Sequence, residues 1–137
     1  EEAKRGGDLI ASREIFAASE KAHPIREEEF IKIERIRGKL LLIGAKDDVL
    51  WETEKYIRRM EKRLGKREHT CEVESYIYEH ATHFVFPEGM VKTILPVGGD
   101  LLTRVFAAGR KFPKECKAAR IDIDRRITQA VNAWKTV

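Results

Sequence analysis

The stretch GKLLLIGAKDDVLW, residues 38–51, decides the fold of this chain. It contains an unbroken apolar run, a glycine, two adjacent aspartates and a tryptophan. A short apolar run bounded by glycines is typical of a strand that is covered on both faces, as in a parallel sheet. We therefore predict a buried strand over 39–44, with Asp47 and Asp48 just beyond its carboxyl end.

The composition indicates a globular domain with a surface of mixed charge. A chain of 137 residues has room for one domain with a modest core, or for a piece of a larger one. The net charge is +4 and the sequence pI is 9.1, but the 27 basic residues are interleaved with 23 acidic ones, as in RRMEKR. Such interleaving favours a solvated surface, so we expect no nucleic-acid partner.

The cysteines and the hydropathy predict the compartment. Cys71 and Cys116 lie in apolar periodic contexts without paired spacing, which indicates two reduced core thiols in a cytoplasmic protein. No apolar run approaches the roughly 18 residues that a membrane span needs, so we expect no membrane contact. The opening EEAKRGGDLIAS has no initiator methionine, which indicates a cleaved or cloned fragment.

Helical patterns lie on both sides of the predicted strand. Asp8 is predicted to be the N-cap of a first helix, which ends before Pro24. Residues 53–64 form an amphipathic pattern that Gly65 closes, so a second helix is predicted there.

The second half of the chain contains another strand and two more helices. Residues 71–78 alternate with period two, which predicts a strand near a sheet edge, and a loop over 79–90 follows. One face of this strand carries Cys71, Val73, Ser75 and Ile77, and the other carries Glu72, Glu74, Tyr76 and Tyr78. A short helix is predicted over 98–106, stopped by Gly109 and Pro113. A long terminal helix carries Ile123, Ile127, Val131 and Trp134.

The order strand, helix, strand, loop, helix predicts a parallel α/β sheet. Two strands alone expose both sheet edges and leave helix faces uncovered. We therefore expect an incomplete sheet, completed either by an upstream part of the same protein or by another copy in a homo-oligomer.

The aspartates and two histidines suggest chemistry at the rim of the sheet. Ligand sites of parallel sheets lie beyond the carboxyl ends of the strands, and His83 follows the second strand there. A carboxylate can hold a histidine in one tautomer and stabilise its imidazolium, as in a Ser-His-Asp relay. The simpler readings are a turn-forming aspartate and a surface histidine. His80 and His83 have metal-ligand spacing without a third ligand, so we expect neither a metal nor a cofactor.

Several segments together resemble one known family. They are KIERIRGKLLLIGAKDDVLW, YEHATHFVFP, the Gly98-Gly99 pair and QAVNAWK. Together they resemble the C-terminal region of the acyl-CoA thioester hydrolase and bile acid-CoA:amino acid N-acyltransferase family, whose members are α/β-hydrolases. The likeness extends from about Ile33 to Trp134. Its most specific part is a DDxxW element followed about 35 residues later by a loop histidine before an aromatic residue.

The resemblance implies roles for individual residues. It implies that His83 is the general base, although Thr82 stands where the family usually has glycine. The DDxxW register implies Asp48 as the acid, whereas the usual offset from Gly44 selects Asp47 as an alternative acid. It also implies that residues 1–137 are a single C-terminal fragment of an α/β-hydrolase catalytic domain, with a helix and linker over 1–32. Trp51 is interpreted as structural, closing the start of the following helix against the sheet.

A relay also needs a nucleophile, which α/β-hydrolases carry on a G-x-S-x-G turn. The sequence has no such element: Ser12 and Ser19 lie in a predicted helix and Ser75 lies mid-strand. Because the serine precedes the acid in this fold, we expect it upstream of Glu1, and we expect the isolated chain to be inactive.

The functional prediction is therefore the C-terminal part of a serine-dependent α/β-hydrolase that acts on acyl-CoA or ester substrates. One alternative is a non-catalytic interaction module that oligomerises through an exposed sheet edge. Another is a parent enzyme with carboxylesterase-like or dienelactone-hydrolase-like activity. The acyl group, the acceptor and any extra N-terminal domain are left open by the sequence.

Overall fold

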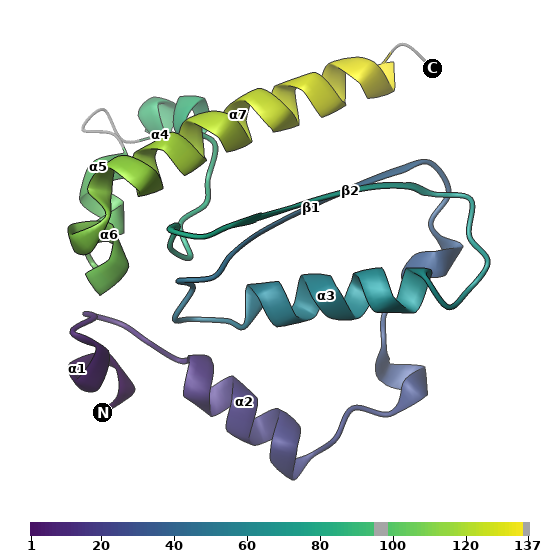
Figure 1. Cartoon of the computed structure of the whole chain (residues 1–137), viewed down its shortest axis with the longest axis horizontal. Helices are drawn as coiled ribbons and strands as arrows, with labels where there is room; N and C mark the ends of the chain where they lie inside the picture. The colour runs from purple at the N-terminus through teal and green to yellow at the C-terminus, as the bar shows by residue number, and fades with distance from the viewer. Residues whose placement is uncertain (95–98, 136–137) are drawn as a thin grey trace.

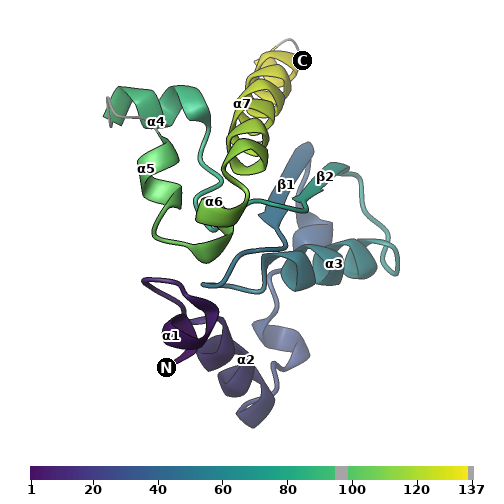
Figure 2. The ribbon, with the colours of Figure 1, turned by 60° about the vertical axis from the view of Figure 1, so that its left-hand side comes forward.

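The computed structural model describes residues 1–94 and 99–135. A small parallel sheet lies in the middle, with one helix on one face and a long helix on the other (Figure 1). Of two short N-terminal helices, residues 13–22 lie beyond the first of these helices, on the side away from the long one, and residues 2–6 lie below residues 107–111 (Figure 1 and Figure 2). The described residues thus form an α/β arrangement of layers around a two-stranded sheet.

The sheet consists of β1 (Lys39–Ala45) and β2 (Glu72–Tyr78). The strands are parallel, and their register runs from Lys39 opposite Glu72 to Ala45 opposite Tyr78. Within the described residues each strand has one paired edge and one unpaired edge. Helices lie on both faces of β1, as the sequence predicts, but most of its side chains are only half-buried in the described residues.

The crossover between the strands is α3 (Thr53–Leu64), with the bounds expected from its periodicity. Ile57 and Leu64 are its buried residues. Thr53 joins the start of α3 to the end of β1: its hydroxyl donates to the carbonyl of Ala45 at 2.9 Å and accepts from that residue's N–H at 3.2 Å. Gly44 permits this close approach, because a Cβ there would lie 2.6 Å from Cδ1 of Ile57.

The period-two pattern correctly predicts the two faces of β2, and the structure shows that they meet different helices. On one face Ser75 donates a hydrogen bond to Glu61 of α3. On the other face Tyr78 donates to Asp122 of the long helix at 2.8 Å. The apolar cluster between the sheet and α3 contains Ile33, Leu64 and Cys71, extended by Ile36, Leu40, Met60 and Val73.

The long helix, α7 (Pro113–Lys135), packs with three short helices: α4 (Glu88–Ile94), α5 (Gly99–Thr103) and α6 (Ala107–Lys111). Three sequence expectations are wrong here. Gly109 lies inside α6, and Pro113 begins α7 instead of stopping a helix, because proline's fixed φ and missing N–H suit the first turn. The loop expected over 79–90 ends earlier, where α4 begins. Gly98, expected to begin the short helix over 98–106, lies outside the described residues.

Arg120 joins these short helices to α7. Its side chain is 2% exposed, its Nε donates to Glu88 at 2.9 Å, and its Nη2 pairs with Asp100. A guanidinium without these carboxylates would be costly to bury, so the ion pairs explain how a charged residue tolerates this position.

The N-terminal region differs from its predicted helix. The structure has α1 (Glu2–Gly6) and α2 (Arg13–Ala22), so Asp8 lies between helices and is not an N-cap. Its carboxylate instead accepts the backbone N–H of Ala107 at 2.7 Å. Two 3-10 turns follow α2: η1 (Glu27–Glu29) and η2 (Ile33–Arg35).

Both cysteines are free and buried, as the sequence predicts. Cys71 lies just before β2, and Cys116 lies in α7. Burial raises the pKa of the Cys116 thiol, which favours its protonated, unreactive form.

Candidate functional site

The loop after β1 places Asp48 in a buried position. Its side chain is 2% exposed. One carboxylate oxygen, Oδ1, accepts the backbone N–H groups of Leu50 at 2.9 Å and Trp51 at 3.0 Å. Aspartate folds the chain in this way because its short carboxylate can satisfy N–H groups two and three residues ahead. The carboxylate is therefore held rigidly by its own loop.

His83 lies against the other oxygen of Asp48. Its Nδ1 is 3.1 Å from Asp48 Oδ2, and its side chain is 20% exposed. A carboxylate accepts only, so neutral His83 must carry its proton on Nδ1, which leaves Nε2 as the free base. No hydrogen bond of Nε2 is found among the described residues. The pair thus fixes the tautomer of the His83 ring and leaves Nε2 able to accept a proton.

Aromatic rings surround the imidazole of His83. The indole of Trp51 lies edge to face with it, with ring centroids 4.8 Å apart and planes at 86°. Phe84 lies on another side at 5.9 Å. Trp51 is 47% exposed and also meets Phe16 of α2, so the expectation that it closes α3 against the sheet is wrong. Its ring contacts the histidine instead.

Asp47 makes a second pair, which the sequence did not predict. Its Oδ2 lies 3.0 Å from Nδ1 of His80, and both side chains are about one-third exposed. The ring of His80 stacks on Phe112, with centroids 3.8 Å apart and planes at 13°. The two adjacent aspartates therefore hold different histidines, and the one that contacts His83 is Asp48. The HxxH spacing of the histidines could have suggested two partners for two acids.

Residues from the N-terminal region support the Asp48 loop. The backbone N–H groups of Ser12 and Arg13 both donate to the carbonyl of Val49, at 3.0 and 2.9 Å. The hydroxyl of Ser12 donates to the carbonyl of Leu50 at 3.0 Å, and Arg13 reaches the carbonyl of Asp48. Sequence reasoning missed this support, because contacts across more than thirty residues leave no local pattern.

Thr82 precedes the histidine where glycine was expected, and it is 1% exposed. Its hydroxyl accepts the N–H of Phe84 at 3.3 Å, so the threonine folds the loop around His83. The three serines have other partners or positions: Ser12 binds Leu50, Ser75 binds Glu61, and Ser19 is exposed on α2. No contact of a serine with His83 is found in the described part of the chain.

Fold and site together define an α/β protein with an aspartate–histidine pair at the carboxyl ends of two parallel strands. The family described as "BAAT / Acyl-CoA thioester hydrolase C terminal" matches residues 7–90. This span is more than half of the chain, so the chain belongs to this family of acyl-CoA thioester hydrolases and acyltransferases.

The family match contains both aspartate–histidine pairs and the N-terminal segment that supports them. It begins earlier than the likeness seen in the sequence, and it ends in α4, so QAVNAWK lies outside it. No curated protein and no solved structure matches the chain. Among the described residues, no helix has the length and apolar character to cross a membrane.

Proposed function

We propose that this chain supplies the acid and the base of a serine-dependent hydrolase of acyl thioesters, as the C-terminal part of an α/β-hydrolase fold. In this proposal Asp48 orients His83, and the serine comes from a segment outside residues 1–137. The observation that carries the proposal is the 3.1 Å contact between Nδ1 of His83 and a buried carboxylate whose other oxygen is already fixed.

The proposed reaction uses the free Nε2 of His83. It takes the proton of the serine hydroxyl while the serine oxygen bonds to the thioester carbonyl carbon. Collapse of the tetrahedral intermediate breaks the carbon–sulfur bond, and the proton passes to the leaving thiolate. Water or an amine then attacks the acyl-serine and loses its proton to His83, which restores the serine hydroxyl. Asp48 stabilises the imidazolium in both steps.

A pair of matched variants tests the role of each aspartate. In a protein that contains this chain and the serine, Asp48→Asn is expected to lower kcat on the order of 10⁴-fold, because asparagine no longer fixes the tautomer. Asp47→Asn should change kcat less than about threefold, since its histidine is a different one. Nitrogen-15 NMR of the isolated chain gives a second readout: Asp48→Asn should shift the tautomer of His83 and leave His80 unchanged. Equal losses in both variants would contradict the assignment.

The isolated chain provides a further test of where the serine lies. Hydrolysis of p-nitrophenyl esters and of acyl-CoA should stay at the buffer rate, because a base without a nucleophile and oxyanion donors does not turn over. Turnover by the pure chain that Ser12→Ala abolishes would place the nucleophile within residues 1–137 and overturn this part of the proposal.

The unpaired strand edges favour a second candidate function. In the described residues β1 and β2 each have one unpaired edge, and an unpaired strand edge can add a strand from another chain. In this second proposal the chain is an interaction module that associates edge to edge. Light scattering on a sizing column tests it: a monomer at all accessible concentrations counts against it.

A further inference from the structure

The outer face of α3 carries a row of basic side chains toward the end of the helix that lies away from the aspartate–histidine pairs. These residues follow helical spacing through the end of α3 and just past it: Arg59, Lys62, Arg63, Lys66 and Arg67. Together with Glu27 and Phe30 they line a groove of about 380 Å³. Positive charge therefore dominates the lining of this groove.

This gathering of basic side chains is not evident from the sequence, because the run RRMEKR mixes basic residues with an acidic one. Glu61, the acid of that run, is turned toward the sheet. Its carboxylate accepts hydrogen bonds from Ser75 of β2 and from Arg58, the latter at 3.1 Å. It is thus withdrawn from the lysines of this face, whereas the arginines there still pair with acidic side chains, as the mixed charge of the sequence predicts.

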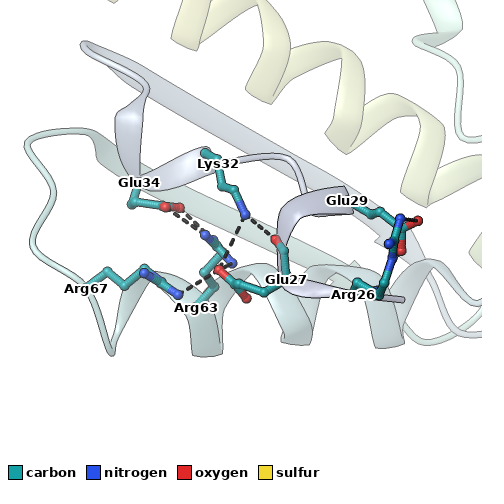
Figure 3. Close-up of polar contacts among 7 residues, drawn as sticks. All are labelled: Arg26, Glu27, Glu29, Lys32, Glu34, Arg63 and Arg67. Carbon is teal, nitrogen blue, oxygen red and sulfur yellow. Dashed lines mark hydrogen bonds and ion pairs between the residues drawn. The ribbon is translucent and has the colours of Figure 1, made fainter. Parts of the chain in front are cut away.

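Arginine side chains form a fixed wall of the groove. Arg63 donates to both oxygens of Glu34, at 2.6 and 2.7 Å, and to Glu27 at 2.9 Å (Figure 3). Arg67 donates to Glu27 at 2.7 Å in the same cluster (Figure 3). The hydrogen bonds from Arg63 hold the pKa of Glu34 at about 2 and lower that of Glu27, so both carboxylates stay ionised at neutral pH.

Two lysines of the groove have no counter-charge. Lys62 and Lys66 are exposed, and no ion pair of either is found among the described residues. Lys62 lies in the last turn of α3, Lys66 lies in the turn just after the helix, and both line the groove, so their like charges repel each other. An anion bound between them would relieve this repulsion and gain charge-assisted hydrogen bonds.

The helix dipole explains only part of the pattern. Cations near a helix C-terminus are favourable, which accounts for Lys62 and Arg63 in the last turn. It does not account for Arg59, which lies a turn earlier, or for a concave lining formed together with Phe30. Arg59 is instead held over the ring of Phe30, 5.6 Å from its centroid, and paired with Glu20. The groove is therefore formed by side chains of two segments, α3 and the chain around Phe30, whose contacts fix their positions.

The groove lies at the opposite end of the sheet from His83. Thr53, at the start of α3, contacts the carboxyl end of β1, whereas Leu64, at its other end, packs with Cys71 beside the start of β2. A ligand in the groove is thus separated from the aspartate–histidine pairs by the length of the helix, and the two sites are independent.

We infer that this groove binds a small molecule bearing two adjacent phosphate groups, held by Lys62, Lys66 and the outer N–H groups of Arg67. Lysine ammonium groups suit phosphate oxygens as mobile point charges, while the arginines beneath them keep the groove in shape. The limited volume fits a compact polyanion better than a nucleic-acid strand.

Titration of the full chain with inorganic pyrophosphate tests the inference. Two-dimensional ¹H–¹⁵N NMR spectra recorded during the titration report which amides are affected. Saturable binding with amide shifts at Lys62, Lys66 and Arg67, and none at His83, is expected. The double variant Lys62→Gln/Lys66→Gln should weaken binding about tenfold, because two charge-assisted contacts at an exposed site are lost.

A charge-matched control separates a specific site from the net positive charge. The double variant Lys114→Gln/Lys135→Gln removes two exposed lysines of α7 and should leave pyrophosphate affinity unchanged. Equal weakening in both doubles, or amide shifts spread over the whole surface, would overturn the inference. So would a single-stranded oligonucleotide that displaces pyrophosphate and binds more tightly in proportion to its length. None of these outcomes bears on the roles proposed for Asp48 and His83.

Discussion

The two aspartate–histidine pairs begin at neighbouring residues of one loop, yet they lie in opposite environments. Asp48 is 2% exposed, and its second oxygen is bound by two backbone N–H groups. Asp47 is 33% exposed, and the only hydrogen bond found for its side chain in the described residues goes to His80. The Asp48–His83 pair is therefore fixed by the loop, and the Asp47–His80 pair lies at the surface.

This difference shows that a shift of one position along the loop decides whether an aspartate forms the buried candidate catalytic pair or an exposed surface pair. Buried charge pairs interact strongly and depend on complete hydrogen bonding, whereas exposed pairs are screened by water. The stacked ring of Phe112 orients His80, but it provides no proton acceptor. The loop after β1 thus holds the side chain of Asp48 in place and leaves that of Asp47 much freer.

Removing each carboxylate gives the largest expected contrast between the pairs. Asp48→Ala leaves the N–H groups of Leu50 and Trp51 and the ring of His83 without an acceptor in a buried site. We expect a loss of about 3 kcal/mol in the free energy of unfolding, measured with urea. Asp47→Ala should cost less than about 1 kcal/mol, because its partner can turn to water.

Asparagine at position 48 refines this comparison. Its side-chain oxygen can still accept the two backbone N–H groups, so Asp48→Asn should recover much of the stability lost in Asp48→Ala. Similar losses for alanine at positions 47 and 48 would show that burial does not distinguish the two carboxylates.

A smaller effect is expected from Gly44, which lies near the end of β1, shortly before both aspartates. A Cβ at this position would lie 2.6 Å from Cδ1 of Ile57 and 3.3 Å from Cβ of Thr53. Gly44→Ala should push α3 away from β1 and cost about 1–2 kcal/mol, measured by urea unfolding.

The matched control for Gly44→Ala adds Ile57→Val, which removes the clashing methyl. The alanine substitution should then cost less in the valine background than in the parent chain, as a double-mutant cycle measures. An equal cost in both backgrounds would assign the effect of Gly44 to its backbone instead of to this contact.

The sequence was sufficient for the elements whose signals are local. Residues 53–64 carry a helical period and form α3, and residues 71–78 alternate with period two and contain β2. The carboxyl ends of parallel strands meet, so Asp48 and His83 could be expected near each other. These predictions needed only periodicity and strand geometry.

Long-range contacts account for what the sequence missed. Aspartate is a residue type favoured at helix N-caps, but the carboxylate of Asp8 accepts the N–H of Ala107, ninety-nine residues away. The pair of Asp47 and His80 depends on Phe112 of the corner between α6 and α7. Such contacts are set by the packing of elements, and neither spacing nor propensity encodes them locally.

The smallest expected effect concerns the end of β2, two residues before His80. Burial and the hydrogen bond to Asp122 raise the pKa of Tyr78 from 10.0 to about 12. Because the folded pKa lies above the unfolded one, folding favours the protonated phenol. The resulting stabilisation is complete below about pH 10 and is lost as the pH rises toward 12.

Tyr78→Phe tests this pH dependence directly. Between about pH 10 and pH 12 the parent chain should lose more free energy of unfolding than the phenylalanine variant, because the variant has no phenol to ionise. Tyr56→Phe serves as the control, since it removes a tyrosine of α3 that does not contact Asp122. Parallel stability curves for the parent chain and Tyr78→Phe would mean that the phenol gains nothing from folding.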